Sequence, residues 1–246
     1  MHGAAKKLAD QLAALAANQL DADPRAMVFR KGALVATDGP ERSMTLREIA
    51  AQANRAPEAF GADADVSLQA TFLWNWPDVN PERKGDRRGS ATHTVLCHGA
   101  LVEVDPETGM VKVLRYVSSE DCGRLINPMI VRGQTMGGVV NGLGWALTEK
   151  FVYDENGQLL TGTFMDYMLP RFSDIPPLEI GHVECPTPFT ALGAKGMGEG
   201  GAIPPMACIA SAVEDAIYHL GGRIRDSHLT PELVLRAIRS RSVSSS

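Results

Sequence analysis

A glycine-rich stretch at residues 193–201 holds the residue types best suited to chemistry in this sequence. Five of its nine residues are glycine, which lets the backbone turn tightly and approach a ligand that side chains would keep away. Backbone amides exposed in this way can bind an anion or an oxo group, and Lys195 can add charge. Glu199 can act as a general base if it is partly desolvated. The alternative is an ordinary glycine turn with Lys195 and Glu199 in solvent.

Residues 196–201 also match the GxGxxG pattern and precede an apolar helical segment, so a dinucleotide-binding site has to be considered. That motif needs a buried strand immediately before it, and residues 185–190, which contain two prolines, make a poor strand. It also needs an acidic residue at the end of a second strand about 20 residues on, whereas Asp215 falls within a predicted helix. The pattern therefore disfavours a dinucleotide fold.

Four further polar residues could take part in chemistry. Gln134 lies at the start of a predicted helix; its amide suits a polar heterocycle or an oxo ligand, or a hydrogen bond between helices. Asp166 is better explained as a turn or cap residue than as a catalytic acid. His93 and His98 are five residues apart on a predicted strand and so face opposite sides. With no third ligand nearby, the sequence predicts no metal site there.

The composition excludes several classes of function. Apolar residues make up 44% of the chain and charged residues 22%, as in an ordinary globular protein. The net charge of -5 provides no basic field for nucleic acid. No run approaches the roughly 20 apolar residues of a membrane span, and no signal peptide is visible, so we expect a cytoplasmic protein. The four cysteines form no CxxC pair, which predicts buried or half-buried free thiols in a reducing compartment: Cys97, Cys122, Cys185 and Cys208.

Helices and hairpins must position these residues. Apolar residues at helical spacing predict helices over residues 4–20, 44–50, 128–147, 205–220 and 231–239. Alternating or short apolar runs predict strands over residues 27–29, 33–35, 66–74, 92–104, 111–117, 151–153, 159–160 and 178–183. We see no internal repeat and no domain linker. The predicted class is α+β, with one folded part over residues 1–240 and a disordered tail over residues 241–246.

Local signals refine three of these segments. Ser43 is the predicted cap of the second helix, and Asn127 followed by Pro128 predicts the start of the third. The third helix is rich in glycine, which costs about 1 kcal/mol per residue, so we expect it to pack closely against another element or a ligand. A polar, basic stretch containing Arg83, Lys84, Arg87 and Arg88 could steer an anion, but a solvated loop or a contact with a partner chain is the better expectation.

Five short motifs occur along the chain in a fixed order: Glu103–Gly109, Asp121–Pro128, Gly133-Gln134 with Gly137-Gly138, Met165–Tyr167, and Leu192–Glu199. Together they resemble the large subunit of the xanthine oxidase family. These are the molybdenum hydroxylases, which include aerobic carbon monoxide, aldehyde and nicotinate dehydrogenases. The likeness covers nearly the whole chain, which resembles the C-terminal third of such a subunit.

This resemblance implies a C-terminal molybdopterin-binding domain with mixed sheets and packed helices. It also implies a molybdenum cofactor, the cytosine dinucleotide form of molybdopterin or a related pterin. By the same likeness, Glu199 lies beside molybdenum and is the general base for a water-derived hydroxylation of a small organic substrate. The backbone of Lys195, Gly196, Met197 and Gly198 lies against the cofactor, and Gln134 approaches the molybdenum ligands or the pterin.

The resemblance also implies partners. In such enzymes electrons leave through two [2Fe–2S] clusters to FAD on other domains or subunits. The sequence lacks the Gly-Gly-Phe-Gly segment, the active-site loop and the Ser-Arg segment that precede its first helix in the family. We therefore expect a partner chain that carries the N-terminal part of the subunit, together with iron–sulfur and flavin subunits. Two alternatives stay open: a redox-neutral molybdenum hydratase of the same family, and a non-catalytic assembly or scaffold subunit.

Overall fold

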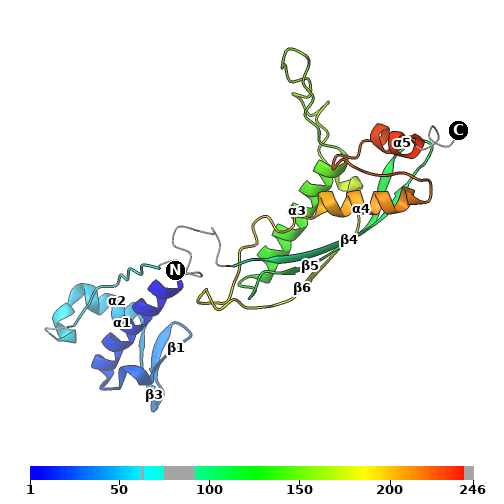
Figure 1. Ribbon diagram of the computed structural model, residues 1–246. Helices are drawn as coiled ribbons and strands as arrows, with labels where there is room; N and C mark the ends of the chain where they lie inside the picture. The colour runs from blue at the N-terminus through cyan, green and yellow to red at the C-terminus, as the bar shows by residue number, and fades with distance from the viewer. Residues whose placement is uncertain (62–63, 75–91, 241–246) are drawn as a thin grey trace, which may run out of the picture. The chain divides into compact units, whose positions relative to one another are not determined.

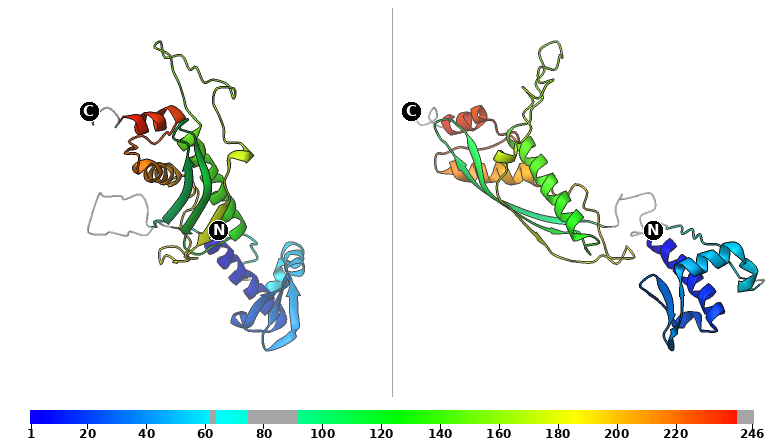
Figure 2. Two further views of the ribbon diagram at one scale, coloured as in Figure 1. Left: turned by 90° about the vertical axis from the view of Figure 1, so that its right-hand side faces the viewer. Right: turned by 180° about the vertical axis from the view of Figure 1, so that it is seen from behind.

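The computed structural model describes residues 1–61, 64–74 and 92–240. It divides the chain into two compact units, Met1–Asp78 and Val79–Ser246, although the sequence showed no linker. Figure 1 shows both units, and Figure 2 gives two further views of each. Two predictions lie outside the described residues: the basic stretch from Arg83 to Arg88 and the tail over residues 241–246.

The first unit packs two helices against a three-stranded antiparallel sheet. Its elements are α1 (His2–Leu20), β1 (Met27–Arg30), β2 (Ala33–Ala36), β3 (Gly39–Thr45) and α2 (Leu46–Arg55). The prediction that Ser43 caps α2 is wrong, because β3 runs on to Thr45. Thr45 and Glu48 form the capping box there, with Thr45 Oγ1 accepting from the Glu48 amide at 3.2 Å. The predicted strand over residues 66–74 is also wrong: this segment contains no strand.

The second unit is built on a mixed sheet in the order β4-β5-β6. Its strands are β4 (Val95–Val104), β5 (Val111–Asp121) and β6 (Leu178–His182); β4 and β5 are antiparallel, and β5 and β6 are parallel. A bulge shifts the β4–β5 register between Leu101 and Val102, where β5 has one extra residue. The bulge changes which β5 side chains face inward, so that Tyr116 is buried together with Val113.

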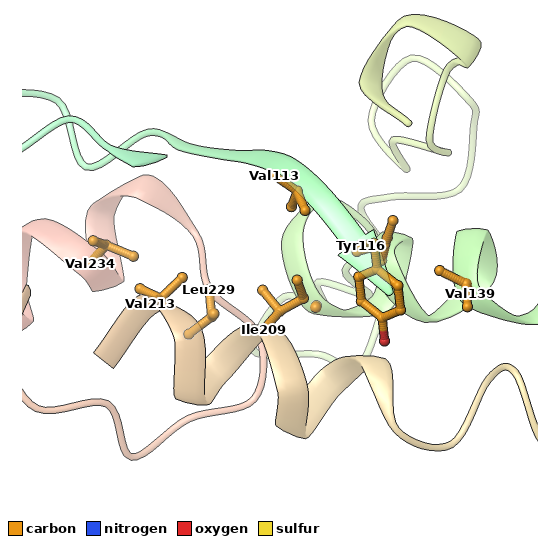
Figure 3. Close-up of a cluster of buried hydrophobic side chains, with 9 residues drawn as sticks. Val113, Tyr116, Val139, Ile209, Val213, Leu229 and Val234 are labelled. Carbon is orange, nitrogen blue, oxygen red and sulfur yellow. The ribbon is translucent and has the colours of Figure 1, made fainter. Parts of the chain in front are cut away.

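Three helices complete this unit: α3 (Pro128–Leu147), α4 (Pro205–Tyr218) and α5 (Pro231–Arg239). Side chains from α3 and α4 meet the inner face of β5 in one apolar core, and Figure 3 shows Ile209 and Val139 around Tyr116. Asn127 caps α3 as predicted, its side-chain oxygen accepting from the Ile130 amide at 3.3 Å. Helices and sheets thus occur in both units, which confirms the α+β class.

Four of the five glycines of α3 fall into two pairs, and the fifth, Gly144, is packed against Glu149 and Pro170. A Cβ on Gly138 would lie 2.7 Å from the backbone nitrogen of Ala202, and one on Gly142 would lie 2.7 Å from Pro205, so α3 meets α4 and the preceding loop at close range. A Cβ on Gly133 or Gly137 would meet no atom within 4 Å. Close packing explains the first pair, and the second pair leaves bare backbone facing open space.

Residues 148–177 connect α3 to β6 as a long arm with little regular structure (Figure 1). The strands predicted over residues 151–153 and 159–160 pair only briefly, through an antiparallel bridge between Tyr153 and Leu159 with backbone hydrogen bonds on either side of it. The arm is fastened at its base, where the Tyr167 hydroxyl donates to Glu149 Oε2 at 2.6 Å. None of the helices in the described part of the chain is long and apolar enough to cross a membrane.

Candidate functional site

The glycine-rich loop at residues 193–201, hereafter the glycine loop, lies beside the chain that leaves β5. The Lys195 amide donates to the Cys122 carbonyl at 2.8 Å, and the Arg124 amide donates to the Gly193 carbonyl at 3.1 Å. Gly123 between them has a φ of 68°, and a Cβ there would lie 2.2 Å from the Gly193 carbonyl oxygen. Only glycine allows this approach, so the motif after β5 and the glycine loop form one structural unit.

Lys195 is engaged by the last residue of β5. Its Nζ lies 2.5 Å from Asp121 Oδ2, and the two side chains are only 12% and 13% exposed. Asp121 Oδ1 accepts from the amides of Gly123 at 2.8 Å and Cys185 at 3.1 Å. The hydrogen bond from Lys195 is the main reason that the pKa of Asp121 lies below its usual value. Because Asp121 holds the ammonium group, the donors that the glycine loop presents outward are its backbone amides.

The tip of the glycine loop is unusually bare. Within the described residues, the backbone N–H groups of residues 196–201 donate to no protein acceptor. A Cβ on Gly196 or Gly198 would meet nothing within 4 Å. Glu199 is exposed; its carbonyl accepts from Ala202 and Ile203, while its carboxylate makes no hydrogen bond to the part of the chain that the structure describes.

Helix α3 forms the neighbouring wall. Gln134 Nε2 donates to the Gly198 carbonyl at 3.2 Å, which joins two of the sequence-predicted site residues directly. This contact is to a loop and so is not the hydrogen bond between helices that the sequence left open, and it leaves the side-chain oxygen of Gln134 able to accept. Gly133 and Gly137 lie on the same stretch of α3 with open space above their backbone. The helix and the loop therefore meet at Gln134 and Gly198.

A bound group that carries oxo or phosphate oxygens fits these residues. The consecutive unpaired amides of residues 196–199 attract such oxygens, and Gly196 and Gly198 leave space where Cβ atoms would block their approach. Glu199 adds an exposed carboxylate to the same loop. Carboxylates on such loops can accept a proton when the site is closed from water. The arrangement suits a polar ligand held by backbone, with one carboxylate available as a base.

Comparison with known proteins agrees with this chemistry. Residues 1–176 match the model of a family described as a molybdopterin cofactor-binding domain. The chain belongs to the molybdopterin-binding large subunits of the xanthine oxidase family. The family-model match includes Gln134 and stops before the glycine loop. Pairwise similarities to individual relatives extend further.

Three relatives show how far the likeness extends. The nicotine 6-hydroxylase large subunit of Paenarthrobacter nicotinovorans is 36% identical over 236 residues, covering 96% of this chain and 28% of the relative. The carbon monoxide dehydrogenase large chain of Hydrogenophaga pseudoflava is 28% identical, covering 98% and 28%. The structure of quinoline 2-oxidoreductase from Pseudomonas putida 86 matches with a TM-score of 0.82 at 33% identity, covering 96% and 28%. The chain thus spans just over a quarter of the length of each of these relatives.

The structure shows no chemical role for the remaining candidate residues. Asp166 closes a turn, accepting from the Thr163 hydroxyl at 3.0 Å, as predicted. His93 is exposed and lies just before β4 rather than on it, whereas the His98 side chain on that strand is buried. The described residues contain no group of three metal-ligating side chains. The cysteines are free, but Cys97 and Cys185 are exposed rather than buried, because their strand and loop positions face away from the core.

Sequence reasoning missed two residues that hold the glycine loop. Asp121 was recognised only as part of a motif, although it is the partner of Lys195. Thr94, just before β4, donates its hydroxyl to the Gly196 carbonyl. Both contacts join residues more than 70 positions apart, so local spacing could not reveal them. A carboxylate at the end of a predicted strand and a lysine in a predicted loop were the available signal.

Proposed function

We propose that this chain forms one wall of the molybdenum site of a hydroxylase or dehydrogenase complex and that Glu199 is the general base. The observation that carries the proposal is the bare tip of the glycine loop, with its unpaired amides, beside Gln134. Membership of the molybdopterin-binding family supports the identity of the cofactor. We further propose the cytosine dinucleotide form of molybdopterin, and [2Fe–2S] clusters and FAD on partner subunits.

In this proposal each group of residues has its own role. The bound cofactor supplies the metal centre that activates a water-derived oxygen and accepts electrons from a small organic substrate. The amides of residues 196–199 hold its oxygen atoms, and Gln134 orients them while it holds Gly198. Glu199 takes the proton from the attacking oxygen. Asp121 and Thr94 keep the glycine loop in place.

The arm between α3 and β6 supports a partner that carries the rest of the subunit. Specific contacts order its base, including the Phe151 and Tyr167 rings with centroids 4.9 Å apart. Yet large apolar side chains along it lie in solvent: Phe164 is 81%, Met165 89% and Phe172 98% exposed. Several large apolar side chains exposed on one segment favour an interface. Because the chain spans just over a quarter of its relatives, the remaining part of a molybdopterin-binding subunit is the proposed occupant.

Replacement of Phe164 and Met165 by serine tests this interface. Both side chains are almost fully exposed, so the substitutions should leave the thermal stability of the isolated chain unchanged. Co-purification with the chain that carries the remainder of the subunit should fall at least tenfold. The same replacement at Val28 and Phe29, which are less exposed apolar residues of the first unit, serves as the control. Undiminished co-purification of the arm variant would rule out the arm as the interface.

The role of Glu199 is tested by Glu199→Gln in the assembled complex. Glutamine keeps the size of the side chain but cannot take up a proton at neutral pH, so turnover should be abolished while assembly and molybdenum content are unchanged. Glu155→Gln, at the exposed turn of the arm, is the matched control. Retained turnover in Glu199→Gln would reject the assignment. If the complex turns over substrate without an external electron acceptor, the reaction is a redox-neutral hydration rather than a hydroxylation.

A further inference from the structure

A buried polar cluster lies behind the glycine loop, on the inner face of the second unit's sheet. Glu120 on β5 is 1% exposed, and Thr135 on α3 is completely buried. The Thr135 hydroxyl lies 2.6 Å from Glu120 Oε2, to which it donates. The other carboxylate oxygen lies 3.5 Å from Nε2 of His98, whose Nδ1 is 2.9 Å from the Tyr116 hydroxyl. Burial of so many polar groups is costly unless their partners are fixed.

Thr135 connects this cluster to the candidate site through its backbone. A Cβ on Gly201 would lie 2.4 Å from the Thr135 carbonyl oxygen, so the end of the glycine loop rests directly on α3. The residue before Thr135, Gln134, donates from its side chain to the carbonyl of Gly198 in the same loop. Backbone packs on backbone at Gly201 with no flexible side chain between. A displacement of Thr135 would therefore move the segment that carries Glu199.

The last two residues of β5, Glu120 and Asp121, support the two ends of the glycine loop. Successive side chains on a strand point to opposite faces. Asp121 binds Lys195, just before the bare tip of the glycine loop. Glu120 binds Thr135, on which the far end of that loop rests. The end of β5 is thus the common support of both ends of the glycine loop.

We propose that Glu120 is a positioning residue for the candidate site, acting through its hydrogen bond with Thr135. This bond fixes α3 against β5 and thereby sets the places of Gln134 and of the loop that carries Glu199. That the positions of Gln134 and Glu199 matter for catalysis rests on the proposed function. The mechanical link itself does not depend on it, because it consists of contacts within this chain.

Amide hydrogen exchange of the full chain in its purified complex tests the link without reference to turnover. Thr135→Val removes the hydroxyl and keeps the shape of the side chain. Exchange should rise about tenfold in residues 133–139 and at the amides of Ala202 and Ile203, which donate to the Glu199 carbonyl, and stay unchanged in α5 and in the first unit. Thr135→Ser, which restores the hydroxyl, should return exchange to the wild-type rate. Thr148→Val is the matched control, because within the described residues the Thr148 hydroxyl makes its hydrogen bond inside its own helix, to the Gly144 carbonyl at 3.4 Å.

The cause is tested at the other end of the bond. Glu120→Gln keeps a side-chain oxygen that can accept from Thr135, so exchange in both segments should match the wild type. Glu120→Ala should behave like Thr135→Val. In the active complex, Thr135→Val should lower kcat with KM and molybdenum content unchanged, and Thr135→Ser should restore kcat.

Two outcomes would overturn the proposal. Unchanged exchange in Thr135→Val would show that the bond does not position the loop, and an equal rise across both units would show general destabilisation instead. Exchange in Glu120→Gln as fast as in Thr135→Val would remove the hydrogen bond as the cause. Failure of the proposed function is distinguishable, because an active Glu199→Gln variant would leave the exchange pattern of Thr135→Val as expected here.

Discussion

Asp121→Asn is expected to destabilise the second unit and loosen the glycine loop. The substitution keeps the size of the side chain and an oxygen that can accept from the Gly123 and Cys185 amides. It removes the negative charge 2.5 Å from Lys195 Nζ. The ammonium group, only 12% exposed as part of its side chain, then lacks its counter-charge.

The magnitude follows from the burial of this pair. Removing one partner of a fully buried ion pair costs about 3–5 kcal/mol, since the other charge is left uncompensated. Here both side chains keep slight access to water, and two of the three hydrogen bonds to Asp121 survive. We therefore expect a loss of about 2 kcal/mol in the free energy of unfolding. For a unit of this size, that lowers Tm by about 4–8 °C.

Thermal unfolding followed by circular dichroism measures this loss, with two comparison variants. Glu232→Gln makes the same chemical change in an exposed pair with Arg236 on α5, and should lower Tm by only a small fraction as much. Adding Lys195→Met to Asp121→Asn removes the uncompensated charge and should recover part of the lost Tm. A decrease in Asp121→Asn no greater than in Glu232→Gln, or no recovery in the double variant, would refute this explanation of the ion pair.

Two further predictions concern pH and the glycines. Because Lys195 lowers the pKa of Asp121 in the folded state, the stabilisation is complete above the unfolded value of about 3.9 and is lost as pH falls through the folded value. Wild type should therefore lose free energy of unfolding more steeply than Asp121→Asn below about pH 4 in acid titrations followed by fluorescence. Gly201→Ala places a Cβ against the Thr135 carbonyl and should lower the free energy of unfolding, measured with denaturant, by about 1–3 kcal/mol. In Gly137→Ala the new Cβ meets open space, so the helix should gain up to about 1 kcal/mol. The same methyl group should reduce the amount of bound pterin. Equal stability of the two alanine variants would contradict the packing of the glycine loop on α3.

The sequence predicted the elements that local signals define. Asn127 with Pro128 marked the start of α3, and the run of glycines announced its close packing at Gly138 and Gly142. The cap at Ser43 was wrong because a strand missed in the sequence extends to Thr45. The prediction was right where residues close in sequence determine the local structure, and wrong where pairing with another strand determines it.

The supports of the candidate site could not be predicted in this way. Lys195 and Asp121 lie 74 residues apart, and only the fold brings them together. Glu120 faces inward because the bulge in the β4–β5 pairing resets the alternation of β5. Gln134 was singled out by its chemistry, but its bond to Gly198 requires the glycine loop to cross α3. Side-chain types identified the site, and tertiary contacts determine its geometry.

The central claim is that this chain completes a molybdopterin site. It is tested most directly by molybdenum and pterin analysis of the complex recovered with the tagged chain. We expect one molybdenum and one pterin per copy of the chain, and a loss of both when Gly137→Ala and Gly196→Ala are combined to fill the bare backbone surface. A stable complex that contains neither molybdenum nor pterin would contradict the account and favour a scaffold subunit.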